Sequence, residues 1–295
     1  DSFEVDRFMR VEIGAPMNGS LPLTRVGRGV AKEGVDHFRV PSEKTIPKGL
    51  DFVREYAENI EQNLKQLKPI VEKIANPNRT VVVMVSNYGQ SELLINFVCR
   101  ARARNITSTQ HVLVVATDEP TQKLAESLGL ATYLDTQYSK KISLKEAGAY
   151  GDTTFRQMML LKVFAVQWVN ALGYNVLFQD LDIAWYQDPI PYFQNYEDRF
   201  DMIFQDDGSR GIRFIPYSGN SGAYYVSYNA RTRYLMSTLV HKASFVLQTG
   251  SHQQSIIAIM HHHASLHGLR VKTLSSDPQL PAGFQYHYYN RTYIR

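Results

Sequence analysis

The segment at residues 175–189, NVLFQDLDIAWYQDP, restricts the fold of this chain more than any other. Its residues 176–178 form an apolar run of the length of a buried strand, and the closing proline ends regular structure. In an extended segment alternate side chains share a face. Asp180 and Asp182 are therefore expected to point the same way, with Leu181 turned into the core.

Two such carboxylates repel each other unless a positive group lies between them. A hard divalent cation with oxygen ligands fits best, and such a cation commonly also binds substrate phosphates. The pair therefore predicts a metal site at the end of a strand. An ordinary acidic strand end is the alternative, because Asp-x-Asp is a short and common pattern. The apolar residues on both sides of the pair favour the metal site.

Apolar runs and helical patterns alternate from Thr80 onward. Strands are expected at residues 81–85, 111–116, 131–134 and 201–207, and helices at 92–104, 121–128 and 153–172. Continuous apolar strands separated by helices are typical of a parallel sheet that is covered on both faces. Ligands bind beyond the carboxyl ends of such strands. This rule places several polar residues along one rim: Ser86, Asn87, Asp118, Asp180 and Asp182.

Residues 155–162 (FRQMMLLK), residues 172–185 (LGYNVLFQDLDIAW) and the Asp-Pro at 188–189 carry a resemblance to a known family. They look like the nucleotide-diphospho-sugar transferase domain of glycosyltransferase family 77, and the likeness runs from about Thr80 to the C-terminus. The resemblance implies a GT-A fold, which is a Rossmann-like α/β fold with a mixed, mostly parallel sheet flanked by helices.

The same resemblance implies an activity. It is that of a retaining, metal-dependent glycosyltransferase, which moves a hexose or pentose from a nucleotide-sugar to a hydroxyl of a glycan or glycoprotein acceptor. The donor is expected to be a UDP-sugar such as UDP-galactose or UDP-xylose. Retention would proceed by front-face displacement assisted by the leaving phosphate. Two alternatives stay open: a metal-dependent nucleotidyltransferase or phosphatase, and a degenerate, non-catalytic sugar-binding module.

The resemblance also implies roles for charged residues. Asp180 and Asp182 would hold Mn²⁺ or Mg²⁺, and His287 resembles the late histidine that often completes such a site. Arg156 and Lys162 are the nearest charges of the upstream helix. They are expected to lie beside the diphosphate, where they would offset the charge of the leaving group. Solvated helix charges are the alternative for both.

Further roles concern the nucleotide and the sugar. Asn87 and Asp118 would hold the base and ribose. Asn220 lies in a segment similar to the family's Asn-x-Gly, which lines the sugar and acceptor pocket; a plain turn with glycines at unusual backbone angles is the alternative. Gln253 would contact the donor sugar or the acceptor, and His252 stands where the family usually carries an acid. The expected cofactor-binding residues are Ser86, Asn87, Asp118, Arg156, Lys162 and Asn220.

The N-terminal part has a different pattern. Residues 1–48 are polar and interrupted by glycine and proline, so irregular structure or a stem is expected. Residues 50–75 place apolar side chains at spacings of three and four, which predicts an amphipathic packing or stem helix. Pro69 should kink it or split off its last turn. The predicted domains are an N-terminal extension, 1–76, and a GT-A domain, 77–295.

Composition excludes some classes. The net charge of +4 is spread over 295 residues without a dense basic run, so no nucleic-acid partner is expected. The single cysteine, Cys99, excludes an internal disulfide. No apolar run has the length of a membrane span, and no signal peptide is visible. The chain begins with Asp, which leaves room for an N-terminal anchor outside this sequence.

Four Asn-x-Ser/Thr sequons favour the secretory pathway weakly, and they begin at Asn18, Asn78, Asn105 and Asn290. The resemblance points to the Golgi lumen and a type II membrane protein, with a cytoplasmic location as the alternative.

Overall fold

The computed structural model describes residues 8–11, 23–26, 45–207 and 217–274. By compactness the chain divides into residues 1–43 and residues 44–295. In the first unit, β1 (Phe8–Val11) and β2 (Leu23–Val26) form an antiparallel pair. The expectation of irregular structure is wrong for these two segments, which pair from Phe8 opposite Val26 to Val11 opposite Leu23.

The second unit is built on a seven-stranded sheet with the order β5-β4-β3-β6-β8-β7-β9. Strand β8 is antiparallel to both of its neighbours, and the other pairs are parallel. The predicted fold class, an α/β fold with a mixed and mostly parallel sheet, is therefore confirmed. The strands are β3 (Thr80–Ser86), β4 (Val112–Ala116), β5 (Ala131–Leu134), β6 (Asn175–Gln179), β7 (Met202–Asp206), β8 (Gly219–Val226) and β9 (Val271–Thr273).

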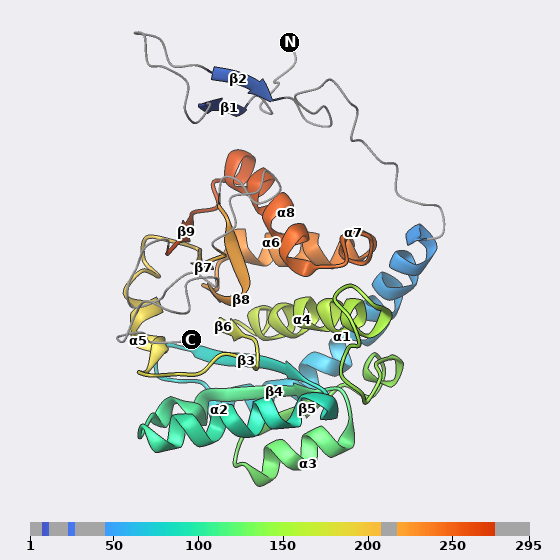
Figure 1. The fold of residues 1–295 in the computed structure, drawn as a ribbon, viewed down its shortest axis with the longest axis vertical. Coiled ribbons are helices and arrows are strands. Elements are labelled where there is room, and N and C mark those ends of the chain that lie inside the picture. The colour runs from blue at the N-terminus through green and yellow to red at the C-terminus, as the bar shows by residue number, and fades with distance from the viewer. Residues whose placement is uncertain (1–7, 12–22, 27–44, 208–216, 275–295) are drawn as a thin grey trace. The chain divides into compact units, whose positions relative to one another are not determined.

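Helices cover both faces of this sheet, with α2 and α3 on one side of β3 and β4 and α4 on the other (Figure 1). The helices are α1 (Thr45–Ile74), α2 (Ser91–Ala103), α3 (Glu119–Ser127), α4 (Thr153–Ala171), α5 (Pro189–Gln194), α6 (Ala230–His241), α7 (Ala243–Thr249) and α8 (His252–His267). Short 3-10 turns occur at Tyr88–Gln90, Thr107–His111 and Ser139–Lys141. In the described part of the chain, none of these helices has an apolar run that would span a bilayer.

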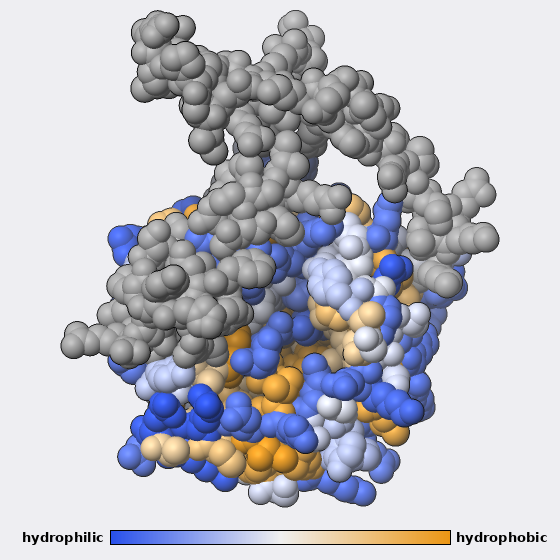
Figure 2. Space-filling view, in the orientation of Figure 1, coloured by the Kyte–Doolittle hydropathy of each residue, from blue (hydrophilic) through white to orange (hydrophobic). Residues whose placement is uncertain are grey.

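Strand β3 shows why the sheet needs helices on both faces. All of its residues are buried. Val81, Val83 and Val85 pack into one hydrophobic core, while Val82 and Met84 pack into the other. The two cores alternate along the strand because successive side chains of a strand point to opposite faces. Hydrophilic surface surrounds a hydrophobic area in the lower half of the face seen in Figure 2, where Figure 1 places α2 and α3.

Helix α4 is buried along most of its length, as the apolar residues outside its main stripe predicted. It packs against the sheet and against α1, α6 and α7. Helix α1 begins five residues earlier than expected, and Pro69 lies inside it without splitting it. Leu67 and Val71 of α1 are fully buried in the core shared with α4 and α7. The domain boundary predicted between residues 76 and 77 stays a prediction.

The strand order sets where a ligand site belongs. From β3 the chain steps outward to β4 and then β5, and β6 returns to the other side of β3. The connections after β3 and β6 therefore diverge, and they leave a crevice beyond the carboxyl ends of these two strands.

Candidate functional site

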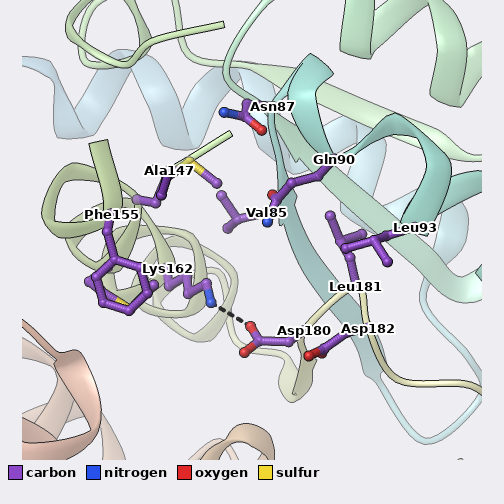
Figure 3. A pocket seen from close by; sticks show the side chains of 12 residues that line it. Val85, Asn87, Gln90, Leu93, Ala147, Phe155, Lys162, Asp180, Leu181 and Asp182 are labelled. Carbon is purple, nitrogen blue, oxygen red and sulfur yellow. Dashed lines mark hydrogen bonds and ion pairs between the residues drawn. The ribbon is translucent and has the colours of Figure 1, made fainter. Parts of the chain in front are cut away.

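A cavity of about 210 Å³ lies at this crevice. Figure 3 shows its three walls: Asn87 and Gln90 follow β3, Phe155 and Lys162 come from α4, and the acidic pair follows β6. The sheet topology thus brings together polar residues from three separate parts of the sequence.

The acidic pair lines this cavity from a turn. Strand β6 ends at Gln179, and the Asp180 amide donates to the Gly222 carbonyl of β8 at 2.8 Å. Leu181, only 4% exposed, packs into the core, while Asp182 is exposed. The two carboxylates face one cavity, as expected. The reason differs from the prediction, because the chain turns at Leu181 and Asp182 instead of remaining extended.

Lys162 is the cation of this site. Its Nζ lies 2.5 Å from Oδ1 of Asp180 (Figure 3). Lys162 belongs to α4, and its side chain is buried. Burial raises the pKa of the Asp180 carboxyl, the Lys162 ammonium opposes this rise, and the charge of Asp182 adds to it. Arg156 is exposed in the first turn of α4 beside Gly250, and it lines neither this cavity nor the one described next.

A second cavity, of about 370 Å³, continues from the first. Both are lined by Phe155, Met159, Lys162 and Asp180. They therefore form one cleft. We call the part beside Asn87 and Gln90 the β3 end, and the part beside Asp207, Asn220 and Gln253 the α8 end.

The α8 end is a hydrogen-bonded network around a carboxylate. Oδ1 of Asp207 accepts from Nδ2 of Asn220 at 3.1 Å and from Nε2 of Gln253 at 3.0 Å. Oε1 of Gln253 accepts from the Ser221 amide at 3.0 Å. Each side-chain amide thus has its orientation fixed by its partners. Asp207 was not anticipated as a site residue, although it follows β7 as Asp180 follows β6, and that position was its signal in the sequence.

The absence of a side chain at Gly222 leaves space for the Asp180 carboxylate. A Cβ at Gly222 would lie 2.8 Å from Oδ1 of Asn220 and 3.1 Å from Oδ2 of Asp180. Gly219 is needed for a similar reason, since its Cβ would meet the ring of Phe204 at 2.8 Å. Both glycines lie in strand β8, and neither has a positive φ. The alternative of a plain turn with glycines at unusual backbone angles is therefore wrong.

His252 begins α8 and is 2% exposed. Burial lowers the pKa of its imidazole well below 6.5, and the Lys162 charge lowers it further. The ring is therefore neutral at pH 7. Its Nδ1 lies 3.0 Å from the Met159 sulfur. His252 stands where the family usually carries an acid, and its imidazole supplies no carboxylate to the cleft.

The β3 end presents unpaired acceptors. Nδ2 of Asn87 donates to the carbonyls of Ser143 and Lys145 at 3.1 and 2.7 Å. Both Nδ2 protons of Asn87 are thus bonded to carbonyls, and these bonds fix the orientation of its side-chain amide. Oδ1 of Asn87 and Oε1 of Gln90 are buried, and neither has a partner among the described residues. A buried acceptor without a donor is costly, so this end suits a ligand that donates hydrogen bonds. Gln90 was not anticipated.

Asp118 and Ser86 lie behind this end and do not line either cavity. Asp118 is the N-cap of α3, and its Oδ1 accepts from the amide and the hydroxyl of Thr121 at 2.7 and 2.6 Å. Its Oδ2 accepts from the Tyr88 amide at 3.0 Å and from the Thr117 hydroxyl at 3.1 Å. Ser86 is fully buried, and its hydroxyl donates to the Asn87 carbonyl. These contacts shape the loop after β3.

The donor set of the acidic pair suits a hard cation, because it consists of carboxylate oxygens that face one cavity. In the described part of the chain, no group of three or more His, Cys, Asp or Glu residues is arranged to hold a metal. His287 lies outside the described residues.

A larger groove, of about 820 Å³, lies between the end of α1 and the edge strand β5. Ile74, His111 and Ala131 line it, so it borders the amino ends of the strands. It contains none of the residues predicted for the site, and ligands of such sheets bind at the opposite edge.

Comparison with known proteins identifies the family. The family model of the nucleotide-diphospho-sugar transferases matches residues 107–284, which is more than half of the chain. This chain belongs to that family. The match includes the acidic pair, Lys162, Asp207, Asn220 and Gln253, whereas Asn87 and Gln90 of the β3 end precede the matched region.

Two curated relatives are named as glycosyltransferases. It is 30% identical over 184 residues to the beta-arabinofuranosyltransferase RAY1 of Arabidopsis thaliana, with 62% of this chain and 33% of the relative covered. It is 27% identical over 172 residues to a UDP-galactose:fucoside alpha-3-galactosyltransferase of Dictyostelium discoideum, with 51% and 26% covered. The chain spans about a third or less of these two relatives.

Among solved structures, core-mannan synthase A of Aspergillus fumigatus is similar with a TM-score of 0.43 and 11% identity, over 66% of this chain and 72% of that one.

Proposed function

We propose that this protein transfers a sugar from a UDP-sugar to a hydroxyl of a glycan or glycoprotein. The observation that carries this proposal is the chemistry along one cleft. A cation and two carboxylates, Lys162 with Asp180 and Asp182, lie between unpaired acceptors at one end and an ordered polar network at the other. A nucleotide-sugar has the matching sequence of groups: a base that donates, a charged diphosphate and a polyhydroxylated ring.

The β3 end would take the base and ribose. Oδ1 of Asn87 and Oε1 of Gln90 are the acceptors that await donors, and the imide N–H of uracil is such a donor. We assign Ser86 and Asp118 a positioning role, because their hydrogen bonds build the loop that carries Asn87. This replaces the direct contact with the ribose that the sequence suggested for Asp118.

The diphosphate would lie at the centre of the cleft. Asp180 and Asp182 would hold Mn²⁺ or Mg²⁺, with His287 as a further predicted ligand. When bound there, the ion would neutralise charge that develops on the departing diphosphate. Lys162 adds a protein cation at the same place, and its ammonium is already held against Asp180. Arg156 would act from the rim, since it is exposed at the start of α4.

The donor sugar would lie between the centre of the cleft and the α8 end, where it meets the acceptor. Asn220 and Gln253 are oriented by Asp207, so their positions are set before a ligand arrives. We propose retention through front-face displacement. The bond from the anomeric carbon to the phosphate oxygen breaks, the acceptor oxygen bonds to that carbon on the same face, and the acceptor proton passes to the leaving phosphate oxygen. A double displacement needs a carboxylate nucleophile, and His252, which stands where the family usually carries an acid, does not supply one.

The relatives narrow the donor and the acceptor. The names of the two relatives above specify an arabinofuranosyltransferase and UDP-galactose with a fucoside. A third relative, from Arabidopsis thaliana, is named a UDP-D-xylose:L-fucose alpha-1,3-D-xylosyltransferase, and it is 30% identical over 145 residues, with 47% of this chain and 37% of the relative covered. We therefore propose UDP-galactose and UDP-xylose as the first donors to test, with a fucose-bearing glycan as the first acceptor. We further propose the Golgi lumen as the site of action, with attachment to the membrane through a segment outside this sequence.

A donor screen tests the proposal. The protein is incubated with a panel of UDP-sugars, Mn²⁺ and fucosides, and the products are separated. Transferred sugar and free UDP in equal amounts are expected, and both should be lost in Asp182→Asn. Released phosphate or pyrophosphate would instead support a phosphatase or nucleotidyltransferase. Sugar binding without turnover would support a non-catalytic binding module.

A further inference from the structure

Tyr150 is an exposed aromatic residue at the α8 end of the cleft. It is 74% exposed, the highest value for any large hydrophobic side chain among the described residues, and it lines the cavity at the α8 end. Scattered exposed hydrophobic residues need no explanation. An exposed aromatic ring at the mouth of a polar cavity is different, because such rings with a few convergent polar groups are the usual lining of ligand sites.

The turn that carries Tyr150 is held by local hydrogen bonds. Asp152 caps α4 and accepts from the Phe155 amide at 2.7 Å. The same carboxylate accepts from the amides of Gly148 and Ala149 at 2.7 and 3.2 Å. The Phe155 bond lowers the pKa of Asp152, and the bonds from the other two amides contribute to this, so the carboxylate stays charged at neutral pH. Tyr150 therefore lies in a turn whose backbone is held in place by these hydrogen bonds, while its side chain is exposed.

This turn lies beside the start of α8. A Cβ at Gly250 would be 3.9 Å from the Cα of Gly151, so the two turns are in contact. Gly250 directly precedes Ser251, the N-cap of the helix that carries Gln253. The contact explains how Tyr150 and Gln253 come to line one cavity although they lie about a hundred residues apart in the sequence.

Tyr150 and Phe155 form an aromatic pair with different positions in the cleft. Their ring centroids are 4.5 Å apart, and the rings are tilted by 46°. Phe155 lines both cavities beside Lys162, whereas Tyr150 lines only the cavity at the α8 end. The inner ring thus borders the centre of the cleft, and the exposed outer ring borders the α8 end alone.

The chemistry at the α8 end suits a sugar. A pyranose ring has a face of C–H groups and an edge of hydroxyls. An aromatic ring can pack against the face, while the oriented side chains of Asp207 and Gln253 can bind the hydroxyls. A polypeptide acceptor would require partners for its backbone amides and carbonyls instead.

We propose that Tyr150, supported by Phe155, is the platform on which the acceptor sugar stacks. The acceptor hydroxyl then belongs to a saccharide and not to a polypeptide side chain. This inference rests on the proposed glycosyl transfer, because it identifies the second substrate of that reaction. It assigns Tyr150 to acceptor specificity and leaves donor binding to the rest of the cleft.

The test compares Tyr150→Ala and Tyr150→Trp with a matched control, Tyr234→Ala. Tyr234 is a 53% exposed tyrosine of α6 that lines none of the cavities described above. The first measurement is hydrolysis of the UDP-sugar by water without acceptor. All three variants should match the wild type in kcat and in KM for the donor, because the exposed Tyr150 ring is placed against the acceptor at the mouth of the α8 end, while the donor sugar would lie nearer Lys162.

The second measurement is saturation-transfer NMR with UDP and the diamagnetic Mg²⁺ present. The probes are methyl glycosides of the common hexoses and pentoses, together with peptides that carry serine, threonine or hydroxyproline. At least one glycoside should receive saturation at the C–H protons of one ring face. Its Kd should rise about three- to tenfold in Tyr150→Ala, the range expected for one aromatic contact, and stay unchanged in Tyr150→Trp and Tyr234→Ala.

The platform is rejected if Tyr150→Ala binds that glycoside as the wild type does, if only the peptides bind, or if no probe glycoside binds while donor hydrolysis continues. Absence of both donor hydrolysis and transfer in the wild type is a separate result, and it overturns the proposed function itself.

Discussion

The two ends of the cleft hold their polar side chains in different ways. At the β3 end, Asn87 and Asp118 use most of their hydrogen-bonding groups to hold loops, and within the described residues the buried Oδ1 of Asn87 and Oε1 of Gln90 have no partner. At the α8 end, Asp207 and Gln253 bond mainly to each other and to β8. Substitutions at the first end should therefore affect stability, whereas substitutions at the second end and the centre should affect turnover.

The largest effect is expected at the centre, in Asp182→Asn. This side chain is exposed, so the free energy of unfolding should change little. Sugar transfer should fall by more than about 100-fold, because the variant loses charge where the diphosphate leaves. Initial rates of UDP release and denaturant unfolding measure the two quantities. Normal turnover in Asp182→Asn would remove the acidic pair from the mechanism.

Gly222→Ala tests the link between the centre and the α8 end. The added Cβ would press on Asp180 and Asn220, which a backbone hydrogen bond and Asp207 hold in place. We expect kcat to fall by about tenfold or more, since small misplacements of reacting groups are costly. Gly148→Ala is the control, because its Cβ would meet only Oδ2 of Asp152, at an ordinary 3.7 Å. Equal effects of the two substitutions on kcat would contradict the packing argument.

Asp118→Ala tests the β3 end. Loss of this N-cap should lower the free energy of unfolding by about 1 kcal/mol. The Kd for UDP should change by less than about threefold, because Asp118 lines no cavity. Thermal unfolding and titration calorimetry measure the two effects. A large loss of UDP affinity at unchanged stability would restore Asp118 as a direct ligand of the nucleotide.

The smallest expected effect is the change of the free energy of unfolding with pH that His252 causes at the α8 end. The folded protein holds His252 neutral, with its pKa well below the value of 6.5 for an unperturbed imidazole. Below pH 6.5 the unfolded chain binds a proton that the folded chain does not, so the free energy of unfolding should fall as the pH drops. The slope is at most about 1.4 kcal/mol per pH unit for one histidine.

His252→Gln should remove its part of this slope. His263 gives the matched comparison, because burial and the neighbouring His267 and His262 lower its pKa to about 4. His263→Gln should flatten the slope between pH 6.5 and about 4. Urea unfolding at several pH values tests both variants. A slope that His252→Gln leaves unchanged would show that this ring is protonated in the folded protein.

The sequence predicted the parts that depend on local pattern. Strands β3 to β7 and helices α2 to α4 follow from apolar runs and helical spacing, and Asp180 and Asp182 were found because they follow such a run. Lys162 was predicted to lie near the acidic pair, although its ion pair with Asp180 depends on how α4 packs beside β6. Helices α6 and α7 and strand β9 were not anticipated.

The parts that the sequence did not predict depend on tertiary packing. Nothing local distinguishes Gln90 or Tyr150 from other polar loop residues; their positions follow from the crevice between β3 and β6 and from the contact of Gly250 with Gly151. Strand β8 lies between β6 and β7 and runs antiparallel to both, an arrangement that the local pattern of residues 219–226 does not specify. Asp207 was within reach, because it ends a predicted strand as Asp180 does.

A crystal structure of the protein with UDP and Mn²⁺ tests the assignment of the two ends of the cleft. Uracil is expected at the β3 end against Asn87 and Gln90, and the diphosphate between Lys162 and the acidic pair. The α8 end should remain open for the sugar. UDP bound with its base against Asp207 and Gln253, or bound in the groove beside β5, would contradict the assignment of the two ends.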